Sequence, residues 1–402
     1  MNIAIIGTYP PRQCGIATFT QDLFKSLHQD PTLAPAIIAI SDGSEDFFPS
    51  EVYISIEKNK IASYLQAAKQ INAAFDAVII QHEYGIFGGE RGDYILDFVR
   101  ALSLPVVTNF HTVLQRPSDA ELRVLQQLSA YSHSVTVMTD TAVEMLQQIY
   151  SIPARKIELI PHGVPHFPYR QSEAKQELGL TGKKVMLSFG FLGPSKGFET
   201  AIEAVAAVPH DDFVYIILGS THPNILREAG ESYREYLQAK ARELGIADRV
   251  HFINEFASEK LLTQYLSACD IYVTPYPNEN QISSGTLSFA IGAGAAVVST
   301  PYWYAKDLLK DDRGLLFDFK DSNALSLIIR ALLEEPQLLA KYRYNAARYG
   351  ASMSWSNVGK LQSKLLQRIV TKDAPVSMTL PRSSAQHTIN NLLRTSTHKL
   401  SS

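Results

Sequence analysis

A lysine and a group of hydroxyl side chains occupy positions suited to binding an anion. Lys196 follows a glycine-bearing turn in FLGPSKGFETAIEAV and precedes a predicted helix. Ser283, Ser284, Gly285 and Thr286 open a second helix, which is rich in small residues. Free N–H groups at a helix start bind phosphate when a cation or hydroxyls stand beside them. The two segments therefore predict a phosphate site, although each alone also fits an ordinary polar helix start.

The elements that hold these segments are short apolar runs alternating with amphipathic stretches. The runs rarely alternate with polar residues, as expected for parallel strands covered on both faces. Strands are predicted at 2–7, 36–40, 77–80, 106–108, 134–138 and 157–160, and again at 184–190, 213–218, 250–253, 270–274, 296–299 and 315–317. This strand–helix alternation predicts an α/β fold with doubly wound parallel sheets.

The alternation starts twice, on either side of a loop rich in Pro, Gly and His at 161–169. A chain of 402 residues also exceeds one ordinary core. Ligands of such folds bind at the carboxyl ends of the strands, so a cleft between two domains is the expected site. The expected parts are an acceptor-side domain at 1–165, a donor-binding domain at 166–352 and a helix at 353–371 that returns to the first domain. The Ser/Thr/Pro-rich tail at 372–402 is expected to be disordered, with a short helix near 389–393 left open.

Composition narrows the function classes. The net charge of −3 gives no reason to expect a nucleic-acid partner. The two cysteines, Cys14 and Cys269, have no metal-binding spacing, and so few cysteines fit a reducing cytoplasm. No apolar stretch is long enough to span a bilayer, and residues 1–7 are expected to form a buried strand and not a signal peptide. A cytoplasmic protein is therefore expected, with peripheral membrane contact left open.

Several segments, in their order along the chain, resemble glycosyltransferase family 4, a group of retaining enzymes. They are GTYPPRQCGIATF near the start, NFH at 109–111, IPHGV at 160–164, FGFLGPSKG at 189–197 and the block 268–309. The resemblance covers about residues 1–370. It implies the GT-B architecture, two Rossmann-like domains facing across a cleft, and metal-independent transfer of a hexosyl group from a nucleoside diphosphate sugar to a hydroxyl acceptor.

The resemblance also implies roles for particular residues. Gly15 would let donor phosphate and acceptor approach the backbone closely, unless it only serves a left-handed turn. His111 would reach the donor sugar from the first domain, unless it is structural. The donor-binding set would be Gly15, Lys196, Gln281, Ser283, Ser284, Gly285 and Thr286, with His111 and Lys196 catalytic. His82 and Glu83 follow another strand and are candidates for acceptor contact by position alone.

Three positions depart from the family. Phe191 replaces the usual phosphate-binding arginine, so Lys196 lacks a partner cation. Gln281 and Phe289 replace the usual pair of glutamates; Gln281 can still hydrogen-bond sugar hydroxyls, but Phe289 cannot hold a ribose diol. Losing that charge-assisted contact removes about 1.5–3 kcal/mol of nucleotide affinity. Nearby Glu279 is either a substitute carboxylate or a surface residue.

These departures leave three functions open. The first is a transferase that holds a nucleotide sugar differently, with more of the diphosphate on Ser283, Ser284 and Thr286. The second is a retaining phosphorylase-like enzyme that uses a sugar 1-phosphate. The third is a catalytically silent protein that binds a sugar or a nucleotide, although His111, Gly15 and Lys196 together argue against it. The chain has no evident carboxylate pair and no Asp-x-Asp at a strand end, so the predicted chemistry is departure of a phosphate without a metal.

Overall fold

A computed structural model describes residues 1–371, except residues 44, 46 and 169. Met1–Val370 form one compact unit, which contains the contacts discussed below. The tail predicted from residue 372, with its short helix near 389–393, lies outside the described residues. The described residues form two separate parallel sheets.

The first sheet has the strand order β3-β2-β1-β4-β5-β6-β7. Its strands are β1 Asn2–Gly7, β2 Ala34–Ser41, β3 Val52–Glu57, β4 Ala77–His82, β5 Val106–Phe110, β6 Ser134–Val137 and β7 Ile157–Leu159. All were predicted except β3. This strand lies at the edge of the sheet, and exposed residues alternate along it with more buried ones, so it lacks the continuous apolar run of the others.

The helices of the first sheet bury its two faces in separate cores. They are α1 Gly15–His28, α2 Ile61–Ala74, α3 Tyr94–Ala101, α4 Asp119–Tyr131 and α5 Asp140–Gln148. Ile3 and Ile5 of β1 join the core on one face, whereas Ala4 and Ile6 join the core on the other. Successive residues of a strand point to opposite faces, which explains why the whole run must be apolar.

The second sheet has the order β10-β9-β8-β11-β12-β13. Its strands are β8 Lys184–Phe189, β9 Phe213–Leu218, β10 Val250–Ile253, β11 Ile271–Thr274, β12 Ala296–Ser299 and β13 Gly314–Leu316, each within one residue of its predicted ends. Its helices are α6 Gln171–Glu177, α7 Phe198–Ala206, α8 Pro223–Ala229, α9 Ser232–Glu243, α10 Glu259–Ala268, α11 Gly285–Gly292, α12 Trp303–Leu309, α13 Ser322–Glu334 and α14 Pro336–Ser352. The prediction of two doubly wound α/β sheets is confirmed.

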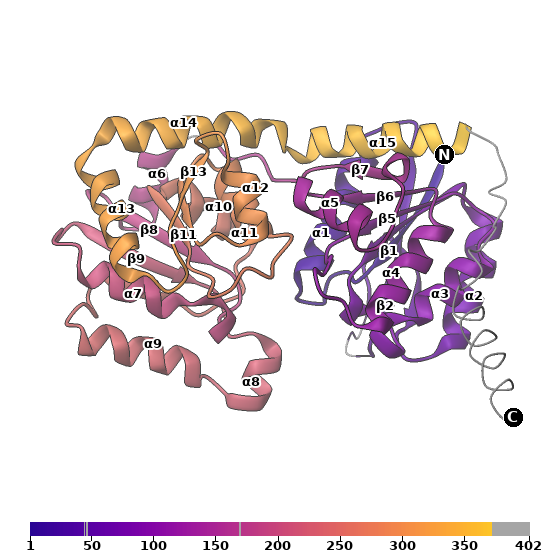
Figure 1. Ribbon diagram of the computed structural model, residues 1–402, viewed down its shortest axis with the longest axis horizontal. Coiled ribbons are helices and arrows are strands. Elements are labelled where there is room, and N and C mark those ends of the chain that lie inside the picture. Colours follow the sequence, from indigo (N-terminus) through magenta and orange to yellow (C-terminus); the bar gives the residue numbers. More distant parts are fainter. Residues whose placement is uncertain (44, 46, 169, 372–402) are drawn as a thin grey trace, which may run out of the picture. The chain divides into compact units, whose positions relative to one another are not determined.

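The last helix, α15 (Trp355–Thr371), packs on the first sheet, while α14 lies along the second (Figure 1). Val358, Leu365 and Leu366 of α15 enter the same core as Ile3 and Ile5. We call the first sheet with α1–α5 and α15 the first lobe, and the second sheet with α6–α14 the second lobe. The chain crosses between the lobes twice, near Val164 and near Met353. The two crossing segments are hydrogen-bonded to each other, because the Val164 N–H donates to the Met353 carbonyl oxygen at 2.9 Å.

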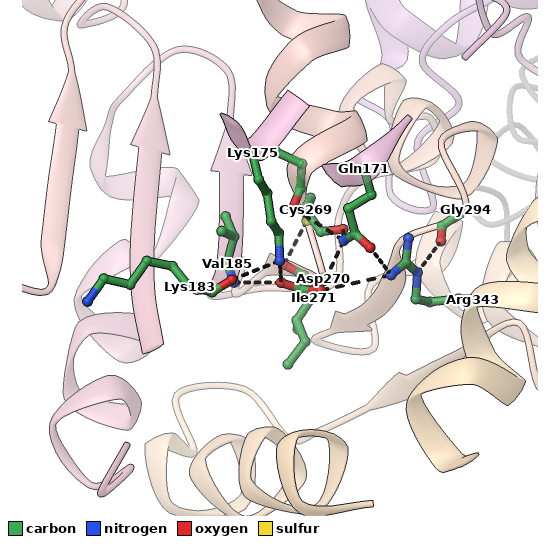
Figure 2. A network of polar contacts seen from close by, with 10 residues as sticks. Gln171, Lys175, Lys183, Val185, Cys269, Asp270, Ile271, Gly294 and Arg343 are labelled. Atoms are coloured by element: carbon green, nitrogen blue, oxygen red, sulfur yellow. Dashed lines mark hydrogen bonds and ion pairs between the residues drawn. The ribbon is translucent and has the colours of Figure 1, made fainter. Parts of the chain in front are cut away.

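A buried polar network fastens α6 and α14 to the second sheet (Figure 2). Asp270, directly before β11, accepts hydrogen bonds from Lys175 Nζ at 2.6 Å and from the Val185 N–H at 2.8 Å. Gln171 Nε2 donates to the other oxygen of Asp270 at 3.0 Å, and Arg343 Nη1 donates to Gln171 Oε1 at 2.8 Å. This network lies at the amino end of β11, whereas the residues predicted to bind the donor follow the carboxyl ends of the strands.

Candidate active site

The loop after β8 brings Lys196 against the loop after β11. Lys196 ends a short 3-10 helix, Pro194–Lys196, and α7 begins two residues later. Gly197, between them, has φ 65°, and a Cβ there would lie 2.2 Å from the Pro275 carbonyl oxygen. Only glycine fits this close approach. Lys196 Nζ donates a hydrogen bond to Tyr276 Oη at 3.1 Å and lies 4.2 Å from the centre of its ring.

Tyr276 links Lys196 to the start of α11. Its hydroxyl lies 3.3 Å from Thr286 Oγ1, which lies 3.1 Å from Ser284 Oγ. Ser284 caps α11, because its hydroxyl accepts a hydrogen bond from the Leu287 N–H at 3.3 Å. A continuous polar chain therefore joins Lys196 to the amino end of α11. The predicted phosphate residues from two separate segments are brought together.

The phenol of Tyr276 is part of this electrostatic environment. Burial alone would raise its pKa. The Lys196 ammonium and the hydrogen bond with Thr286 outweigh burial and hold the pKa of Tyr276 below its ordinary value. Tyr276 was not predicted as a site residue; the available clue was its position two residues after a buried strand, where the side chains of α/β sites gather.

Ser283 connects the second lobe to His111 of the first. Its Oγ donates a hydrogen bond to the main-chain oxygen of His111 at 2.8 Å. Gln281 Nε2 donates to the main-chain oxygen of Ser283 at 3.0 Å, so this side chain supports the loop before α11. The predicted donor residues and the predicted histidine are thus joined by direct contact.

His111 follows β5 and is 5% exposed. Its Nε2 lies 2.8 Å from Gln81 Oε1, an acceptor that Asn109 Nδ2 also contacts. Nε2 therefore carries the proton, which leaves Nδ1 as an acceptor. Burial lowers the pKa of His111 to about 3, with smaller contributions from His162 and His82, so its imidazole is neutral near pH 7.

Gly15 is the exposed first residue of α1. Its φ lies outside the left-handed range, so the alternative explanation of a left-handed turn is wrong for this residue. A Cβ built on Gly15 would meet no atom within 4 Å. Cys14 caps the helix, since its Sγ accepts a hydrogen bond from the Ala17 N–H at 3.3 Å.

His82, a predicted acceptor-side residue, lies inside the first lobe. Its side chain has no exposed surface and packs among the rings of Tyr84, Phe87 and Phe110. Neither ring nitrogen has a hydrogen-bond partner within the described residues. Burial lowers the pKa of His82 to about 3, so its imidazole is neutral.

Glu83, its neighbour, is only partly buried as a residue and stands beside the loop that carries His111. Its carboxylate accepts hydrogen bonds from the Tyr84 N–H at 3.0 Å and from the Thr112 hydroxyl. Burial raises the pKa of Glu83, although both hydrogen bonds favour its charged form. Of the two acceptor-side candidates, Glu83 is the one with exposed surface.

Two of the departures from the family are packed by aromatic rings. Phe191 contacts the rings of His222 and Phe256, with centroids 5.3 and 5.4 Å apart. Phe289 is stacked on Phe189 at 6.3 Å. Aromatic packing therefore occupies the positions where the family resemblance implies charged contacts to the nucleotide.

His162 is a further residue at this site that was not predicted. It lies on the segment between the sheets, and its Nε2 would be 3.2 Å from a Cβ on Gly285. The ring of Phe19 packs edge-on against both His162 and His111, with centroids 5.1 and 4.7 Å apart. The sequence offered only a Pro/Gly/His-rich loop here, which does not distinguish a linker from a site.

No cluster of three or more His, Cys, Asp or Glu side chains with metal-binding geometry occurs among the residues described. Over the same part of the chain, no helix is long and apolar enough to cross a membrane.

Comparisons with known proteins show what this chain is similar to. Residues 170–349 match the family model described as "Glycosyl transferases group 1". A D-inositol 3-phosphate glycosyltransferase from Thermomonospora curvata is 24% identical over 309 residues, which are 69% of this chain and 70% of that protein. One from Stackebrandtia nassauensis is 25% identical over 390 residues, 89% of this chain and 84% of that protein.

Solved structures share the fold at lower sequence identity. Sucrose-phosphate synthase from Thermosynechococcus elongatus has a TM-score of 0.76 at 17% identity, covering 92% of this chain and 99% of that one. Anabaena HepE in complex with UDP and glucose has a TM-score of 0.73 at 17% identity, covering 92% of this chain and 100% of that one. At these identities the likeness shows the fold alone.

Proposed function

We propose that this chain, a glycosyltransferase of the GT4 type with the GT-B fold, transfers a hexosyl group, with retention, from a nucleotide sugar to a hydroxyl acceptor. The observation that carries the proposal is the polar chain from Lys196 through Tyr276 and Thr286 to the amino end of α11. Ser283 ties this end to His111, so groups suited to a phosphate and to a sugar stand together.

The leaving phosphate is assigned to Lys196 and the amino end of α11. A lysine, hydroxyls and free N–H groups stabilise the negative charge that develops as the bond between the anomeric carbon and the phosphate oxygen breaks. The acceptor oxygen attacks the anomeric carbon on the face that the phosphate leaves. Its proton passes to the departing phosphate oxygen, and the anomeric configuration is retained. This scheme needs no metal ion, because the chain's own groups supply the positive charge.

The donor sugar is assigned to His111, Gln281 and the backbone near Gly15. His111 Nδ1 is free to accept a hydrogen bond from a sugar hydroxyl, because Nε2 is used by Gln81. Gly15 leaves open space at the start of α1, which suits close approach of a ligand to the backbone. The amide of Gln281 supports Ser283 and contributes to the sugar contact through that loop.

The acceptor is assigned to the first lobe, with Glu83 as the contact residue and His82 as the side chain packed behind it. In this proposal residues 166–352 bind most of the donor, and residues 1–165 bind the acceptor and add the donor-sugar contacts of His111 and Gly15. The helix at 353–371 returns to the first lobe and holds the two together. Relatives named for inositol 3-phosphate make a phosphorylated polyol one acceptor to test.

A second candidate, a phosphorylase-like enzyme that uses a sugar 1-phosphate, rests on Phe191 and Phe289. Both positions hold aromatic side chains that pack on other rings, so neither offers a charged contact to a nucleotide. The phosphate and sugar groups described above serve either donor. A silent binding protein is the third candidate.

Binding and transfer assays with a panel of ligands distinguish the three candidate functions. Thermal unfolding is followed with UDP, GDP, ADP, UDP-glucose and glucose 1-phosphate, and sugar transfer from the stabilising donor is then assayed with and without EDTA. We expect a nucleotide and its sugar to raise the melting temperature, and transfer to survive EDTA. Stabilisation by glucose 1-phosphate alone would favour the phosphorylase. Ligand stabilisation without transfer or hydrolysis would favour the silent protein.

A further inference from the structure

His162 has the features of a ligand-binding side chain, although it belongs to the segment between the sheets. It is 8% exposed, and its ring packs against Phe19, Phe289 and Trp355. Its Nε2 points at the first residue of α11, 3.2 Å from the position a Cβ on Gly285 would take. A side chain at Gly285 would therefore press on the imidazole.

The hydrogen bonds of His162 fix its protonation. Nδ1 lies 2.7 Å from the Gly163 carbonyl oxygen. A carbonyl oxygen only accepts, so Nδ1 carries the proton and the neutral ring has a bare Nε2. Nε2 makes no hydrogen bond within the described part of the chain. The His162 residue is more than nine-tenths buried, and its Nε2, which has no partner there, is aimed at the start of a helix.

We propose that His162 is a phosphate ligand: when the donor binds, Nε2 takes up a proton from solvent and donates a hydrogen bond to a phosphate oxygen at the amino end of α11. Gly285 is the residue that makes room for it. The imidazolium supplies a second positive charge in addition to that of Lys196, at a site where Phe191 provides none. This inference rests on the proposed function, since it requires a donor phosphate at α11.

Charge and burial agree with this role. Burial lowers the pKa of free His162 to about 4, although its hydrogen bond to Gly163 opposes the shift. A phosphate beside Nε2 raises that pKa, because an adjacent anion favours the charged ring. Donor binding then takes up a proton at any pH between the pKa of the free protein and that of the complex.

Other titratable groups stand nearby, on the elements around His162. His111 on the first lobe has a pKa of about 3. Burial raises the pKa of Asp22, on α1, to about 6. Lys196 and Tyr276 stand beyond Thr286. Any pH dependence caused by the other groups remains when His162 is replaced. The pKa of His111 is lowered mainly by burial and only in small part by His162, so His111 stays neutral in the range tested and the difference between the two proteins isolates His162.

The first test is the pH dependence of UDP-glucose binding, measured by calorimetry from pH 5.5 to 8. UDP-glucose is chosen because its diphosphate is a diester and does not titrate in this range. Wild type is expected to bind at least about threefold tighter at pH 6 than at pH 8, with net proton uptake that is visible as a dependence on buffer enthalpy. His162→Gln should lose that gain and that proton uptake. Equal pH profiles and equal uptake in the two proteins would overturn the proposal.

The second test is a double-mutant cycle with Gly285→Ala. In wild type, the added methyl group presses on His162 and should weaken UDP-glucose binding several-fold. In a His162→Ala background, the same methyl group should cost little, because the obstructing ring is gone. An equal loss in both backgrounds overturns the proposal. Wild type that binds no nucleotide sugar at all defeats the proposed function itself, a different result from either of these.

Discussion

Ser283 Oγ lies 2.8 Å from the main-chain oxygen of His111, so a hydroxyl before α11 is hydrogen-bonded to the loop after β5. Other contacts between the lobes lie further along the chain: Lys310 pairs with Asp140 at 2.6 Å, and both side chains are about half exposed. The Ser283 contact differs from the Lys310–Asp140 pair, because it joins the start of α11, which is assigned to the phosphate, to His111, which is assigned to the donor sugar.

Replacing Ser283 with Ala should lower kcat/KM without unfolding the protein. The lost hydrogen bond contributes about 1 kcal/mol, which corresponds to a roughly fivefold loss. The measurement is steady-state transfer kinetics together with the melting temperature. Ser283→Thr keeps a hydroxyl and should recover most of the activity. Equal kinetics in wild type and Ser283→Ala would disconnect this contact from catalysis.

Lys196→Met should be the more damaging change. The methionine keeps an unbranched side chain but removes the cation next to Tyr276 and the leaving phosphate, and a charge-assisted contact of this kind is worth about 1.5–3 kcal/mol. We expect kcat/KM to fall by a factor between about ten and a few hundred. The matched control is Ser195→Ala, an exposed neighbour in the same turn, which should behave as wild type. Similar activities in the two variants would remove Lys196 from the phosphate site.

The fold was largely predictable because buried parallel strands leave an unmistakable pattern. The continuous apolar runs of β8 and β9 could be located from sequence to within a residue. β3 could not be located in this way. It lies at the edge of the sheet, and exposed residues alternate along it with more buried ones, so it has no continuous apolar run. Burial on both faces, which makes a strand visible in a sequence, is the property that β3 lacks.

The site was predictable only where function requires an unusual residue combination along the chain. Ser284 and Thr286 stand out because hydroxyls open a small-residue helix, and the structure joins them to Lys196. Tyr276 and His162 could not be found in this way. Their relation to the site arises from contacts between segments that are far apart in sequence, and a lone tyrosine or histidine in a loop does not reveal such contacts.

Phe289→Glu tests what the aromatic replacement does. Phe289 packs against Phe189 and against the ring of His162, so a carboxylate there loses ring contacts and is placed among apolar groups. We expect the free energy of unfolding to fall by about 1–3 kcal/mol, with no gain in affinity for UDP. Phe289→Leu, which stays apolar, should lose less stability. Tighter UDP binding by Phe289→Glu would instead mean that a ribose lies at this position.

His82→Phe should stabilise the protein and reduce its sensitivity to acid. The change removes two buried nitrogens that have no partners and keeps a ring among Tyr84, Phe87 and Phe110. The pKa of His82 is about 3 when folded and its ordinary value is 6.5, so the unfolded chain binds the extra proton. The free energy of unfolding that neutral His82 contributes is therefore fully present above pH 6.5. It is lost as the pH falls below 6.5, by about 1.4 kcal/mol per pH unit.

Urea unfolding at pH 7 and at pH 5 measures this effect. The stability lost between these pH values should be smaller in His82→Phe than in wild type by about 2 kcal/mol. His111 and His162 are retained in both proteins, so their own contributions cancel apart from the small part of the lowered pKa of His111 that comes from His82. Identical losses in both proteins would mean that His82 is not the neutral, buried group described.

Asp270→Asn tests the polar network at the opposite end of β11. The substitution removes the carboxylate that pairs with Lys175, whose side chain is only 14% exposed, and leaves that ammonium without its counter-charge. Breaking a buried pair in this way costs about 3–5 kcal/mol of unfolding free energy. The matched control is Glu173→Gln on the same helix, whose pair with Arg170 is more than half exposed and should contribute less than about 1 kcal/mol. The network lies away from Lys196 and α11. The folded fraction of Asp270→Asn should therefore keep the wild-type KM for the donor. A raised KM without a loss of stability would assign Asp270 to the donor site.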